Sequence, residues 1–297
     1  MSLVYFTKDI SKAALLFDAA GFDKFIVPGE EVALKIHFGE PGNTAYLKPQ
    51  QVEPLKQKIK ALGGKPFFTD CNTLYQGRRS NAKEHLEVAK EHGFTDVIIP
   101  ENDDCTEVEV SLKHFRRVHL GGVIARFNRL IVLTHFKGHD VTGFGGTLKN
   151  IGMGFGSRLG KLRMHQDCKT CPEVKTCLRN KTIEACWVGS SPLVQEKIVE
   201  YAYGAVKNKQ VGYFNFVINV SPNCDCYSHA DPSIVPDLGV LASLDPVAID
   251  QASIDLVNQS AGCDIFRKLY PDSDWNVQLG YAESISLGSR KYELMLK

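Results

Sequence analysis

The sequence has no excess of charge of either sign. Its 297 residues include 35 lysines and arginines and 34 aspartates and glutamates, a formal net charge of +1, and the two signs are interspersed. Proteins that bind nucleic acid through phosphate contacts usually carry an extended basic surface. The charge balance therefore predicts no nucleic-acid partner.

Long hydrophobic runs and a secretory leader are also missing. No apolar run reaches the roughly 20 residues that a membrane-spanning helix needs. The first six residues, Met-Ser-Leu-Val-Tyr-Phe, lack the charged region and the hydrophobic stretch of a secretory signal. We therefore expect no membrane partner and a cytoplasmic location.

The cysteines do not suit a disulfide framework. There are nine, an odd number, and a chain of this length can bury a large core without disulfides. Four of them lie between Cys168 and Cys186, so reduced thiols with a local use as metal ligands are expected. Core packing is the expectation for three isolated cysteines, Cys71, Cys105 and Cys263.

Apolar spacing predicts an alternation of strands and helices. The predicted strands are 31–38, 65–69, 96–99, 129–135 and 213–220. The predicted helices are 11–20, with Ser11 as its cap, 51–62, 81–92, 193–206 and 245–257. Alternation of this kind favours an α/β fold with a mostly parallel sheet flanked by helices. We predict a single domain over residues 1–297, interrupted by a cysteine-bearing excursion at 165–190.

A glycine-rich loop follows the most apolar predicted strand, 129–135, where ligands gather in parallel α/β folds. Gly143, Gly145 and Gly146 let the main chain turn tightly and approach a ligand, and a helix beginning near Lys149 would direct free N–H groups at an anion. The spacing is neither that of a P-loop nor that of a dinucleotide-binding loop. An anion or cofactor site is predicted, and the alternative is a tight turn with surface lysines and histidines.

Several ionisable side chains lie on this loop or at strand ends. Lys149 is a candidate nucleophile or carbonyl trap, or alternatively a charge partner for a bound anion. His135 and His139 are candidate proton carriers, and either could instead be a hydrogen-bonded histidine at a strand end. His37 and Asp70 follow other predicted strands and are secondary candidates for the same pocket, unless they cap helices or turns.

A second cluster of chemical groups is formed by cysteines. Two with C-x-x-C spacing and a third one short loop away can chelate one metal ion. The candidates are Cys168, Cys171 and Cys177. The fourth ligand is either Cys186, the nearest in sequence, or one of Cys224 and Cys226 in a distant loop. Zinc and an iron–sulfur cluster both suit thiolates, and a redox disulfide or unligated thiols are the alternatives.

Five stretches of the chain resemble a known family: Lys35–Asn43, Asp70–Tyr75, His135–His139, Gly143–Gly152 and Ser243–Asp250. The family is the bacterial and archaeal domain of unknown function 362. Its members are usually described as iron–sulfur (4Fe–4S) proteins, because many carry a ferredoxin-like run of cysteines after the glycine loop. The resemblance therefore implies an iron–sulfur cluster at the cysteine excursion, although the run here is shorter than the repeated C-x-x-C-x-x-C pattern.

The glycine loop also bears a more distant resemblance to the nickel-pincer lactate racemases. His139, the loop from Gly143, Lys149 and His165 are similar to them in order and spacing. The resemblance implies that Lys149 anchors a nickel-type cofactor or a carbonyl group. It also implies that His139 transfers a proton or hydride equivalent and that His165 contacts the metal.

Taken together, these features predict a metal-dependent enzyme of redox or isomerase type that acts on a small anionic or carbonyl-containing ligand. This prediction requires the glycine loop and the cysteine cluster to face one cavity. The alternatives are a non-catalytic binding module with structural zinc and an electron-transfer protein that serves a redox partner protein.

Overall fold

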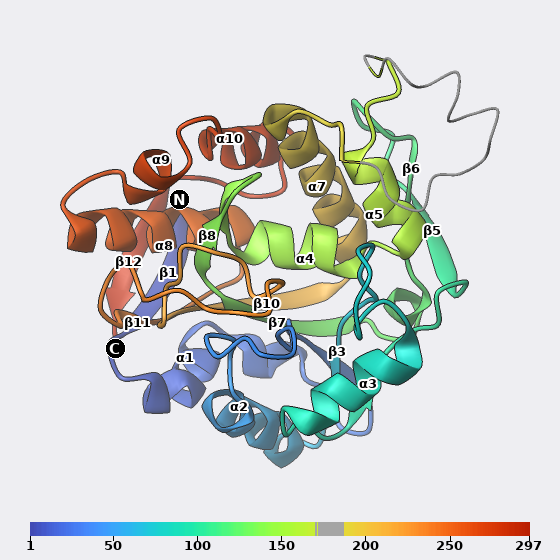
Figure 1. Ribbon diagram of the computed structural model, residues 1–297. Helices are drawn as coiled ribbons and strands as arrows, with labels where there is room; N and C mark the ends of the chain where they lie inside the picture. Colours follow the sequence, from blue (N-terminus) through green and yellow to red (C-terminus); the bar gives the residue numbers. More distant parts are fainter. Residues whose placement is uncertain (170, 172–186) are drawn as a thin grey trace.

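An eight-stranded sheet forms the centre of the computed structural model, which describes residues 1–169, 171 and 187–297 (Figure 1). Its strand order is β12-β1-β11-β10-β7-β2-β3-β4. The strands are β1 Ser2–Thr7, β2 Glu31–Lys35, β3 Lys65–Thr69, β4 Val97–Ile98, β7 Arg129–His135, β10 Gln210–Val217, β11 Gly239–Ser243 and β12 Tyr292–Leu296. Strand β11 runs against both of its neighbours, and the other pairs in this sheet are parallel. The predicted α/β fold with a mostly parallel sheet is confirmed.

Helices cover both faces of the sheet (Figure 1). One face carries α1 Ala13–Ala19, α2 Pro49–Ala61 and α3 Ala82–Glu91, and the other carries α4 Thr147–Phe155, α7 Ser191–Val206 and α8 Pro246–Ala261. The remaining helices are α5 Arg158–His165, α9 Ile265–Leu269, α10 Asn276–Ser284 and the 3-10 helices η1 Ile10–Lys12, η2 Phe22–Phe25 and η3 Gly122–Ala125. Two hairpins, β5 Cys105–Glu109 with β6 Arg117–Gly121 and β8 Lys137–His139 with β9 Gly143–Gly145, complete the described elements. Over the described ranges, no helix combines the length and apolar character needed to cross a bilayer.

Strand β7 is apolar at its centre because both of its faces are buried. Leu130 and Val132 point into the core on one face of the sheet, and Ile131 and Leu133 point into the core on the other face. Side chains alternate across a strand, so a strand covered on both faces needs apolar residues at every position. This double burial fixes the end of β7, and with it the start of the glycine loop.

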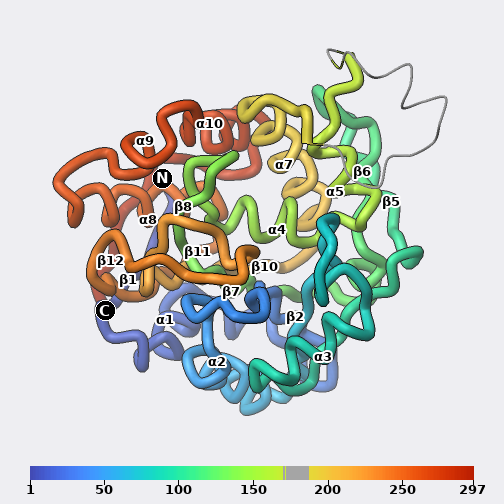
Figure 2. The backbone as a smooth tube through the Cα atoms, in the orientation of Figure 1, coloured from blue at the N-terminus to red at the C-terminus, as the bar shows by residue number. Residues whose placement is uncertain are grey.

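The ends of some predicted elements differ from those observed. Ser11 does not cap a helix, because its backbone N–H donates to the Asp9 carboxylate at 3.0 Å and the first helical turn starts before it. The predicted strand at 31–38 ends at Lys35, and Gly39 then turns the chain with a φ of 82°. The loop after β2 and the loop after β10 consequently lie side by side (Figure 2), where the Glu40 N–H donates to the carbonyl of Asp225 at 2.9 Å.

Candidate functional site

A cavity of about 480 Å³ lies at the carboxyl ends of the central parallel strands. Loops after β2, β3, β7 and β10 line it, together with α4 and α5. The position is the one that parallel α/β folds use for ligands. Most of the site residues predicted on the glycine loop and at strand ends line it: His37, Asp70, His135, His139, Gly145, Gly146 and Lys149. The exception is Gly143, whose φ of 73° and close approach to Trp275 give it a structural role in the β8–β9 hairpin.

Helix α4 begins at Thr147, and its N-terminus is already occupied by an anion from the protein itself. The backbone N–H groups of Thr147 and Leu148 donate to the two carboxylate oxygens of Asp250 at 2.7 and 2.9 Å. The expectation that these groups are free to bind a ligand is therefore wrong. Burial raises the pKa of Asp250 to about 6, against the opposing effect of these hydrogen bonds. A Cβ atom on Gly146 would come within 2.4 Å of this carboxylate, which explains the glycine at that position.

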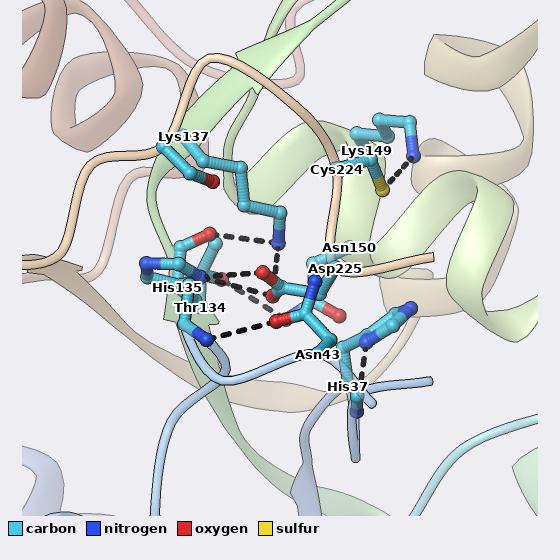
Figure 3. A network of polar contacts seen from close by, with 12 residues as sticks. His37, Asn43, Thr134, His135, Lys137, Lys149, Asn150, Cys224 and Asp225 are labelled. Carbon is cyan, nitrogen blue, oxygen red and sulfur yellow. Dashed lines mark hydrogen bonds and ion pairs between the residues drawn. The ribbon is translucent and has the colours of Figure 1, made fainter. Parts of the chain in front are cut away.

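Lys149 differs from the other lysines and arginines of the cavity in what surrounds its charge. Its Nζ contacts the Sγ of Cys224 at 3.9 Å (Figure 3), and among the residues that the structure describes it has no carboxylate partner. Three other cations of the cavity form ion pairs at 2.8 to 2.9 Å: Lys35 with Asp70, Arg79 with Glu40, and Lys137 with Asp225. Lys161 also lines the cavity without a carboxylate partner among the described residues, but its Nζ donates to the backbone carbonyls of Gly154 and Gly156 at 3.4 and 2.6 Å. No oxygen atom of the described residues accepts from Lys149, which is therefore the cation best placed to bind an anion from outside. Asp70, predicted to bind a cofactor, is instead an internal partner for Lys35.

The His139 ring has one defined tautomer. Its Nδ1 accepts hydrogen bonds from the backbone N–H groups of Val141 and Thr142 at 3.2 and 3.3 Å, which places the proton of the neutral ring on Nε2. Burial, and then the charge of Lys149, lower the pKa of His139. The ring also hydrogen-bonds the thiol group of Cys224, and Nε2 is the nitrogen left to donate. His139 therefore presents a proton to the cavity.

His135 is fully engaged in internal contacts. Its Nδ1 lies 2.9 Å from both carboxylate oxygens of Asp225 (Figure 3). Its Nε2 lies 2.9 Å from the carbonyl of Ile218. Burial alone would raise the pKa of Asp225, but the charges of His135 and Lys137 outweigh it and hold that pKa well below its usual range. The contacts of His135 support an anchoring function, and none of them supports its predicted function as a proton carrier.

His37 and His165 complete the set of cavity histidines. Burial, followed by the charge of Arg79, lowers the pKa of His37 well below its usual value, and its Nδ1 accepts the N–H of Gly39 at 3.1 Å. His165 ends α5 and packs edge-on against Trp187 with ring centroids 4.3 Å apart. Burial, then the charge of Lys149, lowers the pKa of His165 to about 3. Both rings are therefore neutral near pH 7.

The cysteine excursion is described only in part. Cys177 and Cys186 lie outside the described residues. Cys168 lines a separate surface depression with Arg163 and Lys197, and Cys171 follows one turn later, its N–H donating to the carbonyl of Asp167 at 3.0 Å. The cavity lining thus contains His165 but neither of the two described cysteines of the excursion. Within the described part of the chain, no three His, Cys, Asp or Glu side chains are arranged to hold a metal ion.

The cavity contains thiols that the sequence had suggested only as spare metal ligands. Cys224 and Cys226 both line it, with Cys224 3% exposed. The anchoring residues Asp225 and Asp250 were missed as well. Asp250 ends a stretch that carries the family resemblance, which is the one signal that could have drawn attention to it.

Comparison with known proteins identifies the family. Residues 32–255 match the model of the domain of unknown function 362. The chain belongs to this family. No curated protein matches it in sequence.

Two solved structures are similar in fold to this member of the family. One is the lactate racemase apoprotein from Thermoanaerobacterium thermosaccharolyticum, with 14% sequence identity, a TM-score of 0.44, and coverage of 73% of this chain and 51% of that chain. The other is a protein from Thermotoga maritima determined by a structural genomics consortium, with 10% identity, a TM-score of 0.49, and coverage of 86% and 58%. The chain therefore spans between half and three-fifths of the length of these two proteins.

Proposed function

We propose that this protein is a metal-dependent enzyme of redox or isomerase type, and that its substrate is a small molecule with a carboxylate and a neighbouring carbonyl or hydroxyl group. The proposal rests on three side chains that line the same cavity. The cavity combines Lys149, whose charge no described carboxylate neutralises, with the neutral rings of His139 and His165.

The charged and the neutral side chains of the cavity have different functions in this proposal. The Lys149 ammonium binds the substrate carboxylate, because in a buried site an ion pair is much stronger than in water. His139 holds a proton at Nε2 that it can donate to the oxygen of a carbonyl group. The apolar walls formed by Met153, Val194 and Ile198 exclude water from this part of the cavity.

His165 and Lys149 are the side chains that would hold a metal cofactor of the nickel type that the racemase resemblance implies. A neutral imidazole is the form that ligates a metal ion, so His165 would hold the metal and Lys149 would tether the organic part. Such a group would supply Lewis-acid or redox chemistry at the substrate carbon.

An iron–sulfur cluster or a zinc ion at Cys168, Cys171, Cys177 and Cys186 is a second part of the proposal. Cys168 and Cys171 are both solvent-accessible and are spaced to chelate from a single turn. The basic side chains beside Cys168, among them Arg163 and Lys169, would suit an acidic redox partner protein.

Anaerobic purification followed by elemental analysis and a visible spectrum tests the metal content. The metal-containing protein is then incubated with a panel of 2-hydroxy and 2-oxo acids in deuterium oxide, and NMR detects interconversion or deuterium incorporation. Turnover that Lys149→Met abolishes and Lys268→Met leaves intact supports the proposal, since Lys268 is an exposed lysine on α9. Metal-containing protein that converts no member of the panel, or that is unaffected by Lys149→Met, contradicts it.

A further inference from the structure

We propose that Cys224 and Cys226 form a redox-active dithiol that exchanges electrons with small-molecule disulfides entering the cavity. The two thiols are on one tight turn and line the cavity together. This activity goes beyond the proposed acid chemistry, because it needs the two sulfur atoms and no metal.

The turn brings the backbones of the two cysteines close together. The N–H of Tyr227 donates to the carbonyl of Cys224 at 3.1 Å, so the two cysteines occupy the first and third positions of a four-residue turn. Residues at these positions have Cα atoms close enough for a disulfide bond.

The residue between the cysteines fixes the turn in place. Asp225 is anchored by His135 and Lys137 at 2.9 Å each (Figure 3). Its carbonyl accepts the N–H of Glu40. A turn held from three directions keeps both thiols directed at the cavity while their bonding changes.

Cys224 is the attacking sulfur, because the ammonium of Lys149 lies 3.9 Å from its Sγ. A neighbouring positive charge favours the thiolate, which is the form of a cysteine that attacks a disulfide. Cys226 lies two residues along the same turn, lines the same cavity and is the second thiol of the pair.

Another cysteine of the cavity provides an internal contrast. Cys71 also lines the cavity, but burial raises its pKa to about 11. A buried neutral thiol is a poor nucleophile, so position in the cavity alone does not make a cysteine reactive.

The exchange proceeds in two balanced steps. The thiolate of Cys224 attacks one sulfur of the small disulfide, which forms a mixed disulfide and releases the first small thiolate. Cys226 then loses its proton and attacks the sulfur of Cys224, which forms the Cys224–Cys226 disulfide and releases the second small thiolate. The proton of Cys226 passes to a released thiolate, so one disulfide is reduced as one is formed.

The test uses the full-length protein, reduced and free of metal, with 2-hydroxyethyl disulfide as the probe. Remaining thiols are alkylated, and mass spectrometry examines peptide 217–227 released by chymotrypsin. The expected product lacks two hydrogen atoms and carries no alkyl group on either cysteine. In Cys226→Ser, a stable mixed disulfide is expected on Cys224, and in Cys263→Ser, which removes an exposed cysteine, the disulfide is expected to form as in the unchanged protein.

Reaction rates distinguish a Cys224 thiol that Lys149 activates from a thiol that reacts only because the probe can reach it. Lys149→Met is expected to slow the reaction of Cys224 at pH 7 by about tenfold or more, because it removes the nearest positive charge. Peptide 217–227 that stays fully alkylated in the unchanged protein while exposed cysteines react overturns the proposal. A probe adduct on Cys71 rather than Cys224 in Cys226→Ser also overturns it. Because no organic acid or metal takes part, neither result depends on the proposed enzymatic function.

Discussion

The ring of His135 lies 2.9 Å from both carboxylate oxygens of Asp225 and thereby joins the end of β7 to the turn that carries Cys224 and Cys226. The carbonyls of Ile218 and Asn219 accept from its other nitrogen at 2.9 and 3.2 Å. Both sets of contacts form together only when the ring carries two protons. The pair is an internal ion pair that builds one wall of the cavity.

Asp225→Asn is expected to destabilise the protein by about 3–5 kcal/mol, because it leaves the buried cations His135 and Lys137 without their counter-charge. Urea denaturation measures the change in the free energy of unfolding. Asp272→Asn, at an exposed position, is the control and should stay within about 0.5 kcal/mol of the unchanged protein. Equal stabilities of the two variants would exclude the anchoring function of Asp225.

The pKa of Asp250 predicts how the stability of the protein changes with pH. Its folded-state pKa of about 6 lies above the ordinary value of 3.8, so the folded protein binds a proton more tightly than the unfolded chain does. The contribution of Asp250 to stability is therefore full below about pH 4 and falls as the pH rises to about 6. Asp250→Asn should remove this part of the pH dependence, because an amide does not titrate. Parallel stability curves for variant and unchanged protein between these pH values would disprove the assignment.

Gly146 and Gly280 form a matched pair for testing the start of α4. A Cβ on Gly146 would meet the Asp250 carboxylate at 2.4 Å, whereas one on Gly280 in α10 would meet no atom within 4 Å. Gly146→Ala should therefore destabilise the protein by about 1–3 kcal/mol, and Gly280→Ala should leave stability unchanged or raise it by up to about 1 kcal/mol. Thermal unfolding of both variants is the measurement, and a Gly146→Ala variant as stable as Gly280→Ala would contradict the described contact.

The cysteine excursion makes a separate prediction. Cys168→Ser should remove most of the iron or zinc that the anaerobically purified protein contains, because a cluster or zinc site rarely survives the loss of a thiolate. Elemental analysis per chain is the measurement, with Cys263→Ser as the control. Unchanged metal content in Cys168→Ser would show that the excursion does not bind the metal.

The sequence predicts those parts of the fold that depend on local patterns. The continuous apolar run of β7 and the start of α8 beside Asp245 both follow from neighbouring residues, and both are observed. The wall and floor of the cavity depend instead on contacts between distant residues. Asp250 lies 103 residues from Thr147, and Asp225 lies 90 residues from His135.

Distant contacts of this kind cannot be derived from the spacing of one sequence, because many buried aspartates could cap the same helix. The N-terminus of α4 was therefore predicted to be open, and the sequence left two interpretations of His135, a proton carrier and a hydrogen-bonded histidine at a strand end. The cluster of histidine and lysine around the glycine loop was predictable, because local turns bring His139 and Lys149 to the same strand end.

The central claim is that Lys149 makes the cavity a binding site for small carboxylates. Isothermal titration calorimetry with pyruvate, on the unchanged protein and on Lys149→Met and Lys268→Met, tests it most directly. Binding that falls about tenfold or more in Lys149→Met and is unchanged in Lys268→Met is the predicted result. Equal affinities in all three proteins, or no measurable heat in any of them, would contradict the claim.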